Sequence, residues 1–246
     1  MIDIDTSRLS VGLLGVNIDA DTLKTPHKVR IQKAGVDSCA YTVGRPCMLW
    51  YPLQMGNGAY EFGVFENVRD NQYKTVYTDT LMVNMSNPDA VFLQSCVHML
   101  WDKNMECIRE AQYRAHFNST AYNKANVIWQ YLMAYGLKYD TEFAKRVIDE
   151  GIKYDFMPDI DKTYREKTGL CYDFTALFNS MLRSVGVKAK MVHGWPPAGS
   201  PYHAWSEIYV NGKWETVDIT FDIAIKDRPQ NINERKASEY KPVHFY

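Results

Sequence analysis

The character of the sequence changes at Asn87-Pro88, and this change most constrains how the chain can fold. Before it, short runs of alternating apolar and polar residues are separated by turn-forming residues, a pattern that predicts β-strands. After it, and as far as about Tyr139, helix-forming residues dominate. We therefore predict two domains, a β-rich accessory domain over residues 1–87 and a second domain with both helices and strands over residues 88–246.

The strand signals of the first region are short and closely spaced. They are Val29–Lys33, Cys47–Tyr51 and Tyr60–Glu66. Strands of this length and spacing favour a small all-β sandwich or a barrel-like module. Beyond the boundary, apolar residues from Val127 to Tyr135 recur at steps of three and four, with Ser119 or Thr120 placed to cap the start of a helix.

Charge and hydropathy exclude several classes of protein. Lys and Arg number 28 and Asp and Glu 29, giving a formal net charge of -1, whereas nucleic-acid binding usually requires a basic surface. No apolar run approaches the roughly 18 residues that span a membrane. The apolar run from Val11 to Val16 is too short for a signal peptide, so we expect a cytoplasmic protein, or a secreted one if a leader has been removed.

The chain has five cysteines, an odd number, at wide spacings and without a C-x-x-C pair. They are Cys39, Cys47, Cys96, Cys107 and Cys171. This usage suits reduced thiols better than a disulfide framework or a zinc site, and at least one thiol lacks an intramolecular partner. The first four lie in apolar, helical or otherwise unremarkable runs, and we expect them to be inert.

Cys171 stands at the start of a predicted helix. Gly169 ends a polar connection, apolar residues from Phe174 to Val185 follow at helical spacing, and Gly186 stops the helix. The partial positive charge of a helix N-terminus favours thiolate over thiol. The alternative is that Cys171 is a small buried apolar residue, as a lone cysteine often is.

A hairpin is predicted downstream. Asn211-Gly212 separates two alternating runs, which is the strongest short-range signal for a β-hairpin. If these two residues form the loop, Val210 pairs with Lys213, and counting back sets Trp205 opposite Asp218. His203 is then the diagonal neighbour of Asp218 on the same face, within reach of a hydrogen bond.

A thiol at a helix start, an imidazole on a strand and a carboxylate behind it fulfil the roles of nucleophilic catalysis. Cys171 would attack a carbonyl group, His203 would accept and return the proton, and Asp218 would fix the imidazole tautomer. The backbone amide of Cys171 would be one donor to the oxyanion.

Several separated blocks of sequence, in a fixed order, carry a resemblance to a known family. They are Gly169-Leu170-Cys171-Tyr172-Asp173-Phe174, Leu182-Arg183-Ser184-Val185-Gly186-Val187, His203-Ala204-Trp205-Ser206-Glu207, Trp214 and Asp218-Ile219-Thr220. The chain resembles the transglutaminase-like superfamily over about residues 120–222. The resemblance implies an α+β fold with a papain-like transglutaminase core. It also implies a Cys-His-Asp triad at Cys171, His203 and Asp218, and thiol-dependent acyl transfer at amide carbonyls.

The upstream β-region resembles the accessory domain that precedes this core in some bacterial members. Nothing in the chain matches the calcium sites of the animal enzymes, and we expect no metal and no cofactor.

Aromatic residues flank the strand of His203. Trp195, Tyr202 and Trp205 are candidates for the wall of a substrate cleft, and packing in the core or at its rim is the alternative for each. We interpret His193 as structural. The segment from Ile223 to Tyr246 receives no chemical role from its sequence.

The sequence therefore predicts a cysteine enzyme that forms a thioester from a peptide or protein amide, with hydrolysis slightly favoured over crosslinking by an amine. The alternative is a non-catalytic module that binds peptides or serves as a scaffold on the same fold. The expected partner is a peptide or protein substrate rather than nucleic acid or a membrane, and the sequence does not indicate the oligomeric state.

Overall fold

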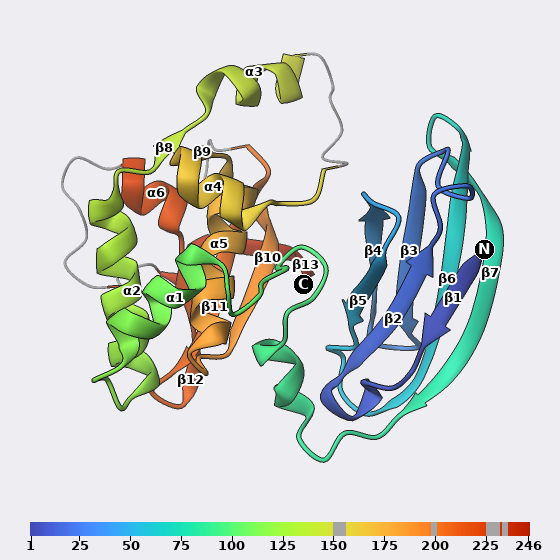
Figure 1. The fold of residues 1–246 in the computed structure, drawn as a ribbon, viewed down its shortest axis with the longest axis horizontal. Coiled ribbons are helices and arrows are strands. Elements are labelled where there is room, and N and C mark those ends of the chain that lie inside the picture. Colours follow the sequence, from blue (N-terminus) through green and yellow to red (C-terminus); the bar gives the residue numbers. More distant parts are fainter. Residues whose placement is uncertain (150–155, 198–200, 225–231, 233–235) are drawn as a thin grey trace. The chain divides into compact units, whose positions relative to one another are not determined.

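The computed structural model describes residues 1–149, 156–197, 201–224, 232 and 236–246 (Figure 1). The chain divides into two compact units. Unit 1 consists mainly of Met1–Val97, and unit 2 begins at His98 and extends to Tyr246, apart from a short segment ending at Met157. The predicted division at residue 87 is drawn from the sequence pattern alone and stays a prediction.

Unit 1 contains two antiparallel β-sheets. Its strands are β1 (Ile2–Asp5), β2 (Leu13–Ile18), β3 (His27–Lys33), β4 (Asp37–Val43), β5 (Met48–Pro52), β6 (Gly58–Arg69) and β7 (Gln72–Val83), with short 3-10 turns η1 (Leu9–Val11) and η2 (Pro88–Leu93). The strand orders are β1-β2-β5 and β4-β3-β6-β7. Tyr41 of the larger sheet meets Tyr51 of the smaller one edge to face, with ring centroids 5.4 Å apart, so their inner faces share a core. The predicted strand regions Val29–Lys33 and Tyr60–Glu66 lie within β3 and β6, and Cys47–Tyr51 overlaps β5 from Met48 onward. The β-rich character is confirmed.

Unit 2 combines helices with an antiparallel sheet. Its elements are α1 (Glu106–Ala115), α2 (Ala121–Tyr135), β8 (Lys138–Tyr139), α3 (Thr141–Asp149), α4 (Ile160–Glu166), β9 (Thr168–Gly169), α5 (Cys171–Ser184), β10 (Ala189–Trp195), β11 (His203–Val210), β12 (Lys213–Val217), α6 (Ile219–Ala224), η3 (Ala237–Glu239) and β13 (Lys241–Phe245). Of the two caps predicted for this helix, Ser119 and Thr120, it is Thr120 that caps α2: its hydroxyl accepts a hydrogen bond from the Asn123 amide at 3.1 Å. The predicted α+β class is confirmed.

Helix α5 lies at the centre of unit 2. It contacts α1, α2, α4 and α6 and also strands β10 and β11 (Figure 1). Every residue from Cys171 to Arg183 is buried, which is the environment of a helix covered on all sides. Gly186, at a φ of 82°, follows the helix, as the sequence predicts.

The sheet of unit 2 has the strand order β12-β11-β10-β13. Asn211 and Gly212 have φ angles of 53° and 81°, the left-handed backbone of a tight hairpin turn, and Val210 pairs with Lys213. The predicted register is confirmed as far as the pair Ser206–Val217. The predicted opposition of Trp205 to Asp218 falls just beyond this last pair, because the chain turns into α6 at that point.

Strand β13 joins the sheet at a glycine. It pairs antiparallel with β10, and the register shifts between His193 and Gly194. A Cβ atom on Gly194 would collide with the Lys241 carbonyl oxygen and lie 2.8 Å from Cη2 of Trp205. The absence of a side chain therefore allows the last strand to approach β10.

We predict that Gly194→Ala destabilises unit 2 by about 1–3 kcal/mol, because the added methyl group meets backbone that cannot move cheaply. Urea denaturation of the variant measures the loss. Gly44→Ala is the control, because its methyl group would meet only the flexible Met157 side chain, at 3.0 Å. Equal stability of Gly194→Ala and wild type would contradict the tight approach of β13.

Candidate active site

Three elements of unit 2 bring Cys171, His203 and Asp218 together. Cys171 is the first residue of α5, His203 is the first residue of β11, and Asp218 directly follows β12. Their exposed fractions are 4%, 7% and 0%. The helix-start position that the sequence predicts for Cys171 is confirmed, and Cys171 is a free thiol.

The residues before Cys171 fix the start of α5. The Asp173 carboxylate accepts a hydrogen bond from the Leu170 amide at 2.9 Å, so a residue of the first turn reaches back to the start of the helix. A Cβ atom on Gly169 would lie 2.8 Å from that of Asp173, so the space beside Asp173 requires glycine. Burial raises the pKa of Asp173, while its hydrogen bond with Leu170 opposes that rise.

The face of α5 that carries Cys171 is tied to the strand that carries His203. Thr175 lies one turn after Cys171, and residues four apart share a helix face. Its hydroxyl donates a hydrogen bond to the Ala204 carbonyl oxygen at 3.2 Å. Because Ala204 is next to His203, this bond fixes the imidazole relative to the start of the helix.

Asp218 receives hydrogen bonds from three donors. Nε2 of His203 lies 3.1 Å from Oδ1 and 3.0 Å from Oδ2 of the carboxylate. The Phe221 amide donates to Oδ1 at 3.2 Å, so Asp218 also caps α6. The Tyr240 hydroxyl donates to Oδ2 at 3.0 Å. These bonds satisfy a charge that is removed from water.

The imidazole of His203 is bound to Asp218 and lines a pocket together with Cys171. Burial opposes its positive charge, but hydrogen bonds with Asp218 and with the Cys171 thiol raise the pKa of His203 to about 10. Since Nε2 faces Asp218, Nδ1 is the nitrogen left for the thiol. The ring of Phe221 stacks on the imidazole, with centroids 5.1 Å apart and planes inclined by 18°. This arrangement favours an imidazolium beside the sulfur.

A pocket of about 70 Å³ opens at this pair of side chains. Its lining residues are Cys171, Tyr172, His193, Tyr202, His203 and Ala204. Burial, followed by the neighbouring His244 and His203, lowers the pKa of His193 to about 3, so this wall is uncharged at neutral pH. His193, interpreted as structural from the sequence, therefore also faces the candidate site.

The three aromatic candidates for the cleft wall lie in different environments. Tyr202 lines the pocket. Trp195 packs edge to face against the Tyr202 ring, with ring centroids 5.3 Å apart, and 51% of the Trp195 surface is exposed. Trp205 is only 1% exposed and packs with Val192 and Tyr240, which is the core packing that the sequence left as the alternative. Substrate contact by any of them stays a prediction.

Phe221 and Tyr240 are site residues that the sequence argument missed. Both belong to or follow α6, where no motif or periodicity marks them. The hairpin identifies Asp218 from nearby residues, but nothing local indicates which distant side chain completes its hydrogen bonds.

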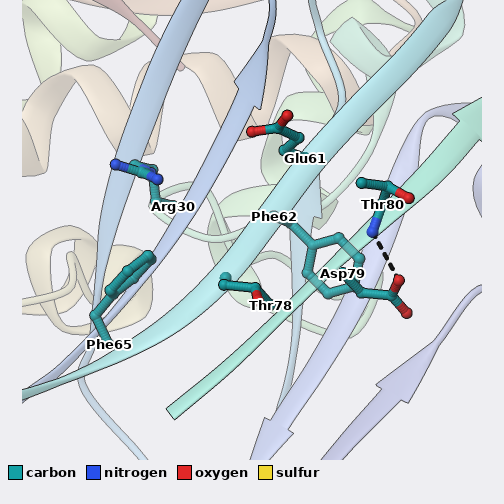
Figure 2. Close-up of a pocket in the computed structure, with 8 residues that line it drawn as sticks. Arg30, Glu61, Phe62, Phe65, Thr78, Asp79 and Thr80 are labelled. Carbon is teal, nitrogen blue, oxygen red and sulfur yellow. Dashed lines mark hydrogen bonds between the residues drawn. The ribbon is translucent and has the colours of Figure 1, made fainter. Parts of the chain in front are cut away.

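A larger pocket lies on the four-stranded sheet of unit 1. It encloses about 430 Å³, and Figure 2 shows its side chains. They are Arg30, Glu61, Phe62, Phe65, Thr78, Asp79 and Thr80, with Gly63 also in the lining. The guanidinium of Arg30 lies over the Phe65 ring, 5.0 Å from its centroid. Among the described residues, none of those lining this pocket is a cysteine or a histidine.

Two further findings concern the part of the chain that the structure describes. It contains no group of three or more His, Cys, Asp or Glu side chains arranged to hold a metal ion. Within the same ranges, none of the helices has the length and apolar character needed to cross a membrane.

Comparison with known families places this site in a recognised domain. Residues 111–219 match the sequence profile of the transglutaminase-like superfamily. This part of the chain, which contains Cys171, His203 and Asp218, is therefore a transglutaminase-like domain. A comparison with curated proteins gave no match.

Solved structures give related results. A candidate cysteine protease from Cytophaga hutchinsonii is 12% identical, with a TM-score of 0.50, and the match covers 96% of this chain and 79% of that one. A TGase structure is 23% identical over 54% of this chain and 33% of its own, with a TM-score of 0.40. Red sea bream transglutaminase is 12% identical over 85% of this chain and 48% of its own, with a TM-score of 0.31. The first likeness supports the fold, and the chain spans only a third to a half of the other two proteins.

We predict that His203 keeps its proton well above its ordinary pKa of 6.5 and loses it near pH 10. Because the folded pKa is raised, the stabilisation from this proton is complete below pH 6.5 and is lost as the pH rises toward 10. Asp218→Asn removes a partner that favours the charged ring, and it lowers the pKa of His203. Titration of the His203 imidazole by NMR measures both values.

Asp159→Asn is the control for this titration, because it alters a carboxyl group of the same unit that instead caps α4, accepting from the Lys162 amide at 3.0 Å. Assignment of the resonance follows from its loss in His203→Gln. A His203 that titrates near 6.5 in the wild-type protein would contradict the hydrogen-bonded arrangement.

Proposed function

We propose that Cys171, His203 and Asp218 form a catalytic triad for thiol-dependent acyl transfer at the amide carbonyls of peptides or proteins. One observation carries the proposal: the imidazole of His203 is hydrogen-bonded to the buried Asp218 carboxylate and lines the same pocket as the Cys171 thiol. The match to a superfamily whose members are typically cysteine-dependent enzymes supports it.

The first half-reaction forms a thioester. The Cys171 thiolate attacks the amide carbonyl carbon, and the electron pair of the carbonyl bond moves to its oxygen. The backbone amide at the start of α5 is available to stabilise this oxyanion, because the first N–H groups of a helix have no partner within the helix. The C–N bond then breaks, and the His203 imidazolium gives its proton to the leaving nitrogen.

The second half-reaction releases the acyl group. Water or a primary amine attacks the thioester carbonyl, neutral His203 takes the proton of the nucleophile, and the C–S bond breaks to restore the thiolate with the imidazolium. Asp218 stays ionised throughout and holds the ring in the tautomer that leaves Nδ1 facing the sulfur. Water yields a carboxylic acid, and an amine yields a new amide.

We favour hydrolysis slightly over amine transfer, so the proposed activity is that of a peptidase or amidase. The proposed substrate is a peptide or protein segment that reaches Cys171 past Tyr202. The wall formed by Tyr172, Tyr202 and the uncharged His193 suits an uncharged group next to the reacting carbonyl.

We predict that iodoacetamide alkylates Cys171 faster than the other cysteines near neutral pH. Burial raises the pKa of Cys39 to about 11 and that of Cys107 to about 12, so these two thiols hold their protons. Peptide mapping by mass spectrometry gives the alkylation rate at each position.

His203→Gln should slow alkylation of Cys171 at neutral pH, because the thiolate loses its positive partner. The partly exposed Cys47 serves as the internal reference for access of the reagent. Alkylation of Cys171 no faster than that of the buried cysteines would count against an activated thiol.

We predict that the protein converts members of a mixed peptide library, and that Cys171→Ala lowers the rate by about 10³-fold or more. Mass spectrometry with and without a primary amine separates the two reactions. Backbone cleavage or release of an acid indicates hydrolysis, while loss of ammonia with incorporation of the amine indicates transfer.

Cys47→Ala is the matched control, since it removes a thiol distant in sequence from the triad and should keep the wild-type rate. Peptide binding without any turnover, unchanged by Cys171→Ala, would instead support the non-catalytic binding module.

A further inference from the structure

The carboxylate of Asp218 is held by more than the triad. It is completely buried, and each oxygen has one donor besides His203: the Phe221 amide at Oδ1 and the Tyr240 hydroxyl at Oδ2. A carboxylate held at one oxygen can still rotate about its Cβ–Cγ bond. Held at both, it keeps its two oxygens facing Nε2 of His203, at 3.0 and 3.1 Å.

Tyr240 is itself fixed on several sides. It is 6% exposed, and its ring packs against that of Trp205 with centroids 4.9 Å apart. Val192 and Phe245 belong to the same cluster. The Tyr240 amide donates to the Ala237 carbonyl oxygen at 3.1 Å in the turn η3. The hydroxyl is therefore aimed at Asp218 by packing and by its backbone.

The segment that carries Tyr240 lies outside the superfamily match, which ends at residue 219. Strand β13 follows Tyr240 directly and is anchored to β10, where Gly194 allows the close approach of Lys241. Because β13 is anchored in this way, the Tyr240 side chain reaches Asp218 from a segment outside the one that holds the proposed triad.

We propose that Tyr240 is a positioning residue of this active site. It acts through Asp218: its hydroxyl holds Oδ2 so that the carboxylate stays aligned with His203 while the imidazole gives up and regains its proton. The inference rests on the proposed function and extends it to the segment after α6, whose sequence suggests no chemistry.

The test compares three variants of the whole chain with the wild type. Tyr240→Phe removes only the hydroxyl from Asp218. Tyr164→Phe is the matched control, because it removes a buried hydroxyl of the same unit that bonds to Tyr131 at 2.6 Å. Asp218→Asn is the reference for a lost carboxylate.

Two readouts separate positioning from general stability, and the melting temperature is recorded alongside. The first is the pH profile of Cys171 alkylation by iodoacetamide, which reports the thiolate beside an imidazolium. The second is the low-field NMR resonance of the His203 Nε2 proton, which reports its bond to Asp218.

In Tyr240→Phe we expect alkylation on the acid side of neutrality to slow by about tenfold, the order expected for a lost hydrogen bond to a charged group. We also expect the Nε2 proton resonance to shift or to broaden by exchange with water. In Tyr164→Phe we expect the alkylation profile and the Nε2 proton resonance to match those of the wild type, even if its melting temperature falls as much as that of Tyr240→Phe. If Tyr240→Phe does not fold, 3-fluorotyrosine at position 240 keeps the ring and makes the hydroxyl a stronger donor, and it should shift the same resonance.

The proposal is overturned if Tyr240→Phe, or the fluorotyrosine protein, matches the wild type in both readouts while Asp218→Asn changes them. Failure of the proposed function gives another pattern, in which Asp218→Asn also changes neither readout and Cys171 reacts no faster than the buried cysteines.

Discussion

The buried carboxylate of Asp218 requires hydrogen-bond donors, and this requirement constrains how the elements of unit 2 are arranged. A carboxylate without access to water is tolerated only where donors surround it, because desolvation otherwise costs several kcal/mol. The three donors come from β11, from the first turn of α6 and from the segment after η3. Meeting this requirement brings together parts of the chain that no continuous hydrophobic pattern connects. The arrangement around the sulfur follows from it.

Features set by neighbouring residues could be predicted from the sequence. Asn211-Gly212 adopts the positive φ angles that its residue types favour, and from that turn the pairing of β11 with β12 follows by counting. The start of α5 at Cys171 follows equally from the helical spacing beyond it. Local patterns likewise marked β3, β5 and β6 of unit 1, although neither its other strands nor how the strands are shared between two sheets.

Features set by distant residues could not be predicted. The closeness of Trp205 to His203 in the sequence suggested a role in the cleft wall. The outcome depends on Tyr240, which covers Trp205 from a segment whose docking has no sequence signature. Gly194 is needed for the close approach of β13. From sequence alone, however, a glycine in a strand is equally compatible with a bulge, a bend or the close approach of another chain segment.

The position of β13 also has a consequence for the order in which the molecule is assembled. Strand β13 pairs with β10 but is synthesised after β11, β12 and α6. A nascent chain that has formed the hairpin but still lacks residues 237–245 leaves Oδ2 of Asp218 without its hydroxyl donor and Trp205 without its cover. The surroundings of Asp218 are therefore complete only after residue 240 has been synthesised, when the helices that surround α5 are already available to fold.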